Sequence, residues 1–460
     1  MQSANRKEGE ALVNSVVFGY HMEEQSMVST WSSGSPLPPH SNNDVTVKGP
    51  CTDGCFTFID FLPECRDPGG IFSRPEFETF RTIIDRANAW LRANLKWEIV
   101  TCESVEFKAR GESINSEKMV YLEHGEVSTW YIRGLRLWIS ERETDQEKEQ
   151  QIGYVNVIPQ QDNEGGIFST PVYERLDDVV SRFNRMIQTR PLPGRIITIE
   201  SQEMKTSRSN ELEPDRSSWV ESGSRQKHFL FVLRIFFEIS DGVPEEIGIM
   251  DFLPDAVTSG GVFSLPQYEP FSHVIEKASI WCAKQNGIRV CNSQSLEIKI
   301  KTGREADTQK MDFTEHGGRA TFYVRILRVA YVKTRDPSNK NQMPMPLTQL
   351  TCRTFVPVQL TTGLFIPDFE NLQETKERVT AWVKATGVKV VSAETAALRV
   401  LTGGEAKNGT EASFTFNRAE RDEYWIFVIR LYINGPYHEP PTEMLPPVPE
   451  LEEQSCCSIS

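Results

Sequence analysis

The chain has 460 residues, a net charge of −14 at neutral pH and a hydrophobic content of 38%. The acidic balance argues against nucleic acid as a partner, because phosphates require a cationic surface. No stretch approaches the roughly 18 apolar residues of a membrane-spanning helix, and the N-terminus lacks the apolar core of a secretory signal. The composition therefore indicates a globular protein of several domains.

The first segment, residues 1–50, is expected to be disordered. Beyond it, the nine cysteines are scattered along the chain, which is typical of a reduced, cytosolic protein. Cys51, Cys55 and Cys65 lie near one another, but no fourth ligand has the spacing of a zinc finger. We therefore predict neither a metal site nor a cofactor.

A short motif recurs four times, at intervals of about 100 residues. The sequence Gly-Gly-Ile-Phe-Ser-x-Pro occupies residues 69–75 and 165–171, returns with valine in place of isoleucine at 260–266, and persists in reduced form at 362–367. Similarity at a near-constant spacing is the signature of tandem repeats. We predict four of them, at residues 51–141, 152–240, 245–334 and 351–434.

A helical pattern follows each motif. In the first repeat the apolar residues fall on one stripe of an amphipathic helix, and they are Phe77, Phe80, Ile83, Ile84, Ala87, Trp90 and Leu91. The motif serine is expected to cap this helix, with Ser73 and Glu76 forming a capping box. The paired glycines suit a tight turn. The alternative is an anion site at the start of the helix.

Apolar runs before and after each helix predict the order strand–helix–strand–strand, with a polar loop of about twenty residues before the last strand. The fold class is therefore α+β. One such unit buries too little apolar surface alone. We expect the four repeats to pair into two six-stranded sheets, antiparallel or mixed, with helices on one face. This order resembles the duplicated modules of gyrase-inhibitor-like effector-binding domains, which implies a small-molecule groove between paired copies.

Charged residues recur on the last two strands of the predicted unit. Ser-x-Glu-x-Lys occurs three times, as Ser104, Glu106 and Lys108; Ser201, Glu203 and Lys205; and Ser295, Glu297 and Lys299. The final strand carries an arginine in each repeat, namely Arg136, Arg234, Arg328 and Arg430. Glutamates and arginines on adjacent strands can pair across a sheet, at roughly 0.2–1 kcal/mol a pair. The favoured interpretation is a solvated ladder of charges, and the alternative is a groove for a ligand or partner.

Catalytic signals are weak. Glu-His-Gly occurs at residues 123–125 and again at 315–317, in the long loops of the first and third repeats. A turn beside a glycine explains this motif better than a catalytic or metal site without partners. No arrangement of nucleophile and base stands out. We therefore expect a protein that is not an enzyme.

The C-terminus carries a lipidation signal. Cys457, Ser458, Ile459 and Ser460 match a prenylation motif, and the terminal serine favours a farnesyl group. One such chain gives only marginal membrane binding. A polybasic second signal is absent, since no lysine or arginine follows Arg430. The expected second signal is palmitoylation of Cys456.

The lipidation signal sets the expected location and function. Residues 435–460 form a proline-rich acidic tail, expected to be an extended spacer between the folded body and the bilayer. We expect a prenylated and methylated lipoprotein on the cytoplasmic face of a membrane, whose partner is membrane lipid through the covalent anchor. Its leading function is a non-enzymatic adaptor or scaffold. The alternative is the binding of a small amphipathic ligand in grooves between paired repeats.

Overall fold

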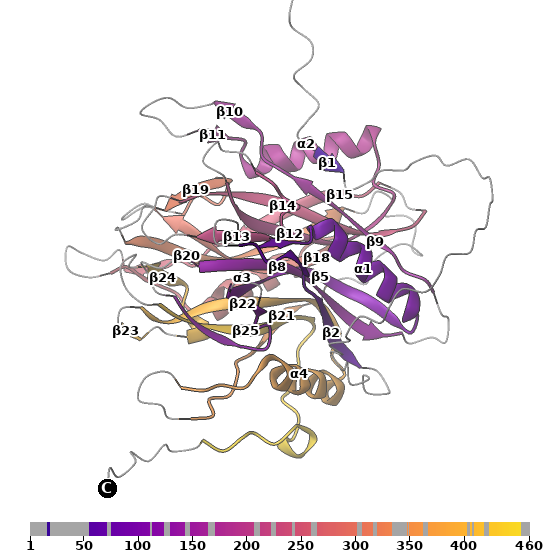
Figure 1. Ribbon diagram of the computed structural model, residues 1–460. Helices are drawn as coiled ribbons and strands as arrows, with labels where there is room; N and C mark the ends of the chain where they lie inside the picture. The colour runs from indigo at the N-terminus through magenta and orange to yellow at the C-terminus, as the bar shows by residue number, and fades with distance from the viewer. Residues whose placement is uncertain are drawn as a thin grey trace, which may run out of the picture.

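The computed structural model confirms an α+β fold in which strands predominate (Figure 1). It describes residues 16–18, 55–70, 75–110, 113–123, 129–142, 148–163, 171–206, 212–221, 227–241, 244–258, 265–300, 306–315, 320–333, 347, 349–361, 367–402, 405–406, 409–417 and 423–451. Within these ranges, no helix combines the length and the apolar character needed to cross a membrane.

The four α-helices of the described residues follow the predicted apolar stripes. They are α1 (Phe80–Ala93), α2 (Leu176–Thr189), α3 (Phe271–Ala283) and α4 (Leu372–Thr386). In α1 the buried residues include Phe80, Ile83 and Ala87, as the periodicity predicts. The stripe buries these side chains against a sheet, which is what stabilises a helix of this length.

The predicted capping box of the first helix is wrong. The N-cap of α1 is Thr79, whose side chain accepts a hydrogen bond from the backbone N–H of Thr82. Glu76 instead belongs to the short strand β4 (Glu76–Phe77), so the helix begins later than Ser73 would require. A capping box does occur in α4, between Asn371 and Glu374.

The strands form four larger sheets, each named here after its central strand. The β8 sheet contains β2 (Phe56–Phe61), β8 (Thr129–Glu141), β5 (Trp97–Arg110), β6 (Ser113–Ile114) and β13 (Ser218–Glu221). The β14 sheet contains β1 (Val16–Phe18), β9 (Ile152–Val157), β14 (Lys227–Ile239), β12 (Gly194–Lys205) and β19 (Asp312–Glu315). The β20 sheet contains β15 (Glu246–Phe252), β20 (Thr321–Lys333), β18 (Ile288–Ile300) and β24 (Phe414–Asn417). The β25 sheet contains β21 (Leu350–Phe355), β25 (Glu423–Asn434), β22 (Val390–Thr402), β23 (Glu405–Ala406) and β7 (Val120–Glu123).

Smaller elements accompany these sheets. Three two-stranded sheets pair β3 (Cys65–Asp67) with β4, β10 (Gln161–Asn163) with β11 (Val172–Tyr173), and β16 (Ala256–Thr258) with β17 (Gln267–Tyr268). Two 3-10 helices are η1 (Gly409–Glu411) and η2 (Thr442–Met444).

Four sheets therefore replace the two six-stranded sheets that we expected. The reason lies in the long loops before the final strands, which contain short strands that the sequence did not reveal. β2 covers only residues 135–140 of β8, so the edge at residues 129–132 is free to pair with β13. An unpaired edge is a template for a further strand, and here a loop supplies it.

These added strands link the four sheets into a closed ring. β13 pairs with β8, β19 with β14, and β24 with β20, so each sheet takes a strand from the next stretch of chain. β7, from near the beginning, pairs with β25 and completes the circle. The helices follow the same order, because α1 contacts β9, α2 contacts β15, α3 contacts β21 and α4 contacts β2.

The long strands β5, β12, β18 and β22 lie at the centre of this ring (Figure 1). β5 contacts β12, β12 contacts β18, β18 contacts β22, and β22 contacts β5. Both faces of these strands therefore lie inside the protein. The polar residues of the predicted charge ladder are brought together there.

Two terminal predictions can be compared with the described residues. Within the first fifty residues, Val16–Phe18 form β1 on the edge of β9; the other residues of that segment lie outside the described ranges. At the other end, Tyr437 packs against Trp382 of α4 with ring centroids 5.1 Å apart. Glu439 accepts a hydrogen bond from the Trp382 indole and pairs with Arg353 at 2.8 Å. The start of the tail therefore packs on the folded body instead of acting as a spacer.

Candidate functional site

A closed circle of hydrogen bonds joins the four central strands. On β5, Ser104 donates from both its backbone N–H and its hydroxyl to Glu200 of β12. The contact recurs between Ser201 and Gln294, between Ser295 and Glu394, and between Thr395 and Glu103. The last of these joins residues 292 positions apart and returns to β5. We call these eight residues the central hub.

The four arginines of the predicted ladder hold the hub together. Arg136, Arg234, Arg328 and Arg430 donate from Nη1 to Thr395, Ser104, Ser201 and Ser295 respectively, at 2.7–2.8 Å. All four are at most 3% exposed. The interpretation as a solvated charge ladder is therefore wrong for these arginines, because the neighbouring sheet covers the face that a single unit would expose.

The far side of each guanidinium is occupied in different ways. Arg136 forms a bidentate ion pair with Asp60, in which both nitrogen–oxygen distances are 2.7 Å. Arg328 forms the same kind of pair with Asp251, and both distances there are 2.8 Å. Arg234 donates to Asn156. Arg430 faces Thr354 in the register, and its Nε has no hydrogen-bond partner among the described residues. The expected cross-strand pairing of these arginines with the Ser-x-Glu-x-Lys glutamates is not seen. In the strand register, Glu103 lies opposite Arg136, and the motif glutamate Glu106 comes three residues later on β5.

A cavity of about 370 Å³ lies beside the hub. That size falls within the range of about 300–1,000 Å³ that is typical of small-molecule sites. Residues of β5, β12, β18 and β22 all line it, so each sheet contributes to one shared chamber. Its aromatic wall consists of Phe107, Tyr121, Tyr131, Phe229, Phe231, Phe313, Tyr323, Trp425 and Phe427.

Most of the carboxylates in the cavity wall have cationic partners. Glu106 accepts from Arg133 at 2.7 Å. Glu297 accepts from Arg325 at 2.8 Å and from Arg399 at 2.9 Å. Two further pairs involve Lys227, which lies 2.9 Å from Glu221 and 3.7 Å from Glu315.

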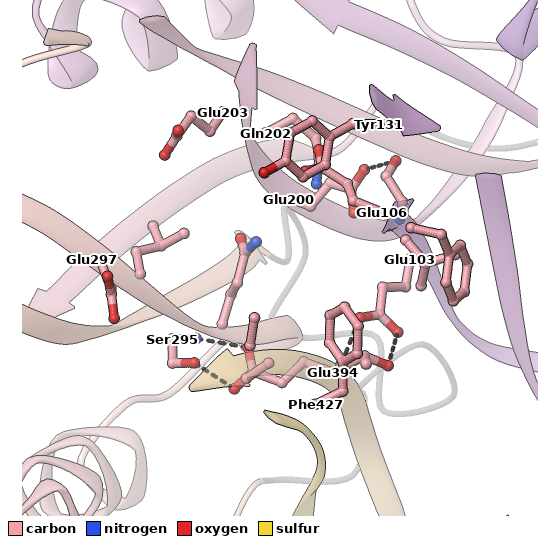
Figure 2. A pocket seen from close by; sticks show the side chains of 18 of the residues that line it. Glu103, Glu106, Tyr131, Glu200, Gln202, Glu203, Ser295, Glu297, Glu394 and Phe427 are labelled. Carbon is pink, nitrogen blue, oxygen red and sulfur yellow. Dashed lines mark hydrogen bonds between the residues drawn. The ribbon is translucent and has the colours of Figure 1, made fainter. Parts of the chain in front are cut away.

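Glu203 differs from its neighbours. Among the described residues its carboxylate has no hydrogen bond and no ion pair, and only its backbone carbonyl is bonded, to Arg133. It lines the cavity, and its side chain is exposed whereas those of Gln202 and Met204 are buried. Figure 2 shows no hydrogen bond from the Glu203 side chain to the other residues drawn, whereas one joins Ser295 to Glu394.

Burial shifts the acidity of these groups. Desolvation raises the pKa of Glu203 well above its usual range, and the nearby carboxylates of Glu315, Glu221, Glu106 and Glu297 raise it further. Desolvation also raises the pKa of Glu103 in the hub to about 7, against the opposing effect of Arg136. Glu297 shows the opposite result, because Arg399 and Arg325 outweigh its burial and lower its pKa.

Several of the predicted site residues lie outside the part of the chain that the structure describes. Cys456, Cys457, Ser458, Ile459 and Ser460 lie outside the described residues, so lipidation stays a prediction. Much of each glycine motif and both histidines of the Glu-His-Gly motifs also lie outside them. Glu315 of the second such motif lines the cavity.

Sequence reasoning noticed the ladder residues but missed the hub acceptors. Glu103, Glu200, Gln294 and Glu394 each precede the serine or threonine of the pattern by one position. That shared position was the available signal. Within the described part of the chain, no group of three or more histidine, cysteine, aspartate or glutamate residues is arranged to hold a metal ion.

Comparisons with protein-family models, with curated proteins and with solved structures found no match to this chain. The resemblance to effector-binding domains therefore stays an expectation.

Proposed function

We propose that this protein is a non-enzymatic binding protein that encloses a small amphipathic organic ligand in its central cavity and is tethered to a membrane by its lipidated tail. The observation that carries the proposal is the chamber itself, because the strands of all four sheets converge on it. A chamber lined by both polar groups and aromatic rings suits a ligand with polar and apolar parts.

The architecture behind this proposal is four tandem strand–helix–strand–strand units, at residues 51–141, 152–240, 245–334 and 351–434. Three long strands in the same order recur in each larger sheet, and an arginine occupies the same register in each. Linked copies of one unit would enclose a shared site at their common centre. The proposed site thus replaces the two separate grooves expected from paired units.

A binding role suits four of the chamber's carboxylates better than catalysis. The hub carboxylates Glu200 and Glu394 are engaged by serine N–H and hydroxyl groups. Glu106 and Glu297 are engaged by arginines. Side chains fixed in this way shape and polarise a cavity, whereas a general acid or base needs a group that can reach a reacting atom.

Filling the cavity should abolish ligand binding. Ala397 lines the chamber opposite Phe427 in the register, so Ala397→Trp places an indole inside it. Small molecules that co-purify with the full-length protein from eukaryotic cells should be detected by mass spectrometry after denaturation, and should be absent from the Ala397→Trp variant. Overpacking costs about 1–3 kcal/mol, so Ala397→Leu serves as a milder second variant, and unchanged circular dichroism confirms folding. A ligand content equal to that of wild type in both variants would contradict the proposal.

The membrane tether is tested separately. Replacing Cys457 with serine removes the thiol that would accept the prenyl group. The variant should move from the membrane fraction to the soluble fraction of eukaryotic cells. Replacing Cys456 with serine should give partial release, because a single prenyl chain binds only marginally. Unchanged membrane association of the Cys457→Ser variant would remove both the anchor and the adaptor function, for which the tail is the main support.

A further inference from the structure

Within the described part of the chain, the carboxylate of Glu203 in the cavity wall has no hydrogen bond and no ion pair. Glu106, Glu221, Glu297 and Glu315 each lie against an arginine or lysine, as described above. Glu203 lies among these four carboxylates, which come from four different strands, and has no cation of its own among the described residues. Carboxylates placed in this way repel one another, so ionisation of Glu203 is disfavoured until a cation lies beside it.

The position of Glu203 makes it accessible from the chamber. Its side chain is exposed there, while the neighbouring Gln202 and Met204 are buried. Its cross-strand neighbour on β14 is Phe231, which packs against Phe313 with ring centroids 5.5 Å apart. An unpaired carboxylate beside aromatic rings is the combination that recognises an organic cation with an apolar body.

We infer that the ligand of the central cavity is a small organic amine or guanidine, whose cationic head pairs with Glu203 and whose apolar part lies against the aromatic wall. This inference rests on the proposed function and adds the chemical class of the ligand. A metal ion is disfavoured, because no cluster of three or more suitable ligands exists among the described residues. An anion would face the unpaired carboxylate and would be repelled.

Burial and like charges hold the pKa of Glu203 high in the free protein. A cation beside it would counter both effects and stabilise the ionised form. An anionic or neutral ligand offers no such gain. The same reasoning explains why Glu203, and not Glu297, is the recognition residue, since two arginines already stabilise the charge of Glu297.

Three fluorinated probes of equal size test the inference. They are 4-fluorophenethylamine, 2-(4-fluorophenyl)ethanol and 4-fluorophenylacetate, which are cationic, neutral and anionic at pH 7. Ligand-observed fluorine NMR on the full-length protein measures their affinities. The amine should bind wild type at least tenfold more tightly than the other two. Glu203→Gln should weaken the amine at least tenfold and leave the alcohol within twofold.

Matched variants separate this inference from the proposed function. Glu76→Gln changes an exposed glutamate that does not line the cavity and should leave all affinities unchanged. Ala397→Trp should remove binding of every probe. If the amine and the alcohol bind with equal affinity, and Glu203→Gln changes neither affinity, the cationic ligand is refuted. Loss of binding of both probes in Ala397→Trp would still support a ligand chamber in that case. Absence of amine binding at 10 mM also refutes the inference, and the co-purified ligand then decides the proposed function independently.

Discussion

Replacing Arg136 with alanine should lower the free energy of unfolding by about 3–5 kcal/mol. Arg136 is fully buried and forms the bidentate ion pair with Asp60. It also donates a hydrogen bond to Thr395 of β22, where the last sheet meets the first. Its guanidinium also lies 3.9 Å from the ring centroid of Phe58. Without it, Asp60 loses its bidentate partner and Glu103 loses the cation that opposes the rise in its pKa.

An exposed arginine provides the control for this prediction. Arg175 pairs with Asp307 through two hydrogen bonds of 2.9 and 3.2 Å, but both side chains are about half exposed. Its replacement with alanine should cost no more than about 1 kcal/mol, because solvent already screens the pair. Urea unfolding followed by tryptophan fluorescence measures both variants. Arg136→Lys keeps the charge but not the fork geometry and should fall between them. Equal costs for Arg136→Ala and Arg175→Ala would show that the hub does not stabilise the ring.

Raising the pH from 5 to 8.5 should destabilise the protein, with Glu103 alone contributing about 2.5 kcal/mol. The pKa of Glu103 is raised from its usual 4.5 to about 7, so between these values the folded state holds a proton that the unfolded chain has lost. Stability therefore falls as the pH rises through this window. Glu203 acts in the same direction. His228, whose pKa is lowered by burial, acts in the opposite direction around pH 6.

Glu203→Gln isolates one part of this pH dependence. Glutamine is close in shape to a protonated glutamate, so the melting temperature should be nearly unchanged at pH 5. At pH 8.5 it should rise, because the variant no longer has to bury an unpaired charge or to hold a proton at high pH. Differential scanning calorimetry at both pH values checks this, with Glu76→Gln as the exposed control. A lower melting temperature of the Glu203→Gln variant at pH 8.5 would mean that Glu203 has a stabilising partner.

Local patterns in the sequence were sufficient for the helices and for much of the strand assignment. The stripe of Phe80, Ile83 and Ala87 marks a helix because side chains three and four positions apart share one face. Alternation around Val105 and Phe107 marks a strand for a similar reason. The loop strands β7, β13, β19 and β24 were missed, since their pairing partners lie in another part of the chain.

The candidate site could be predicted only in part. The sequence identified Arg136 and Glu203 as members of recurring polar positions, but it offered no means of distinguishing a solvated face from an internal one. That distinction depends on what covers the face. Thr395 lies 259 positions from Arg136 in the chain and yet hydrogen-bonds to it, and no local periodicity encodes such a contact.

By itself, the sequence determined which segments become helices and long strands, and it placed an arginine in the central strand of each larger sheet. The tertiary structure decided that the four sheets close into a ring and that their polar strands meet at its centre. It also decided that Glu203 lies beside a cavity, with no partner for its carboxylate among the described residues. The physical reason is range. Backbone conformation follows from neighbours a few residues apart, whereas burial and electrostatic pairing follow from packing between residues as many as 292 positions apart.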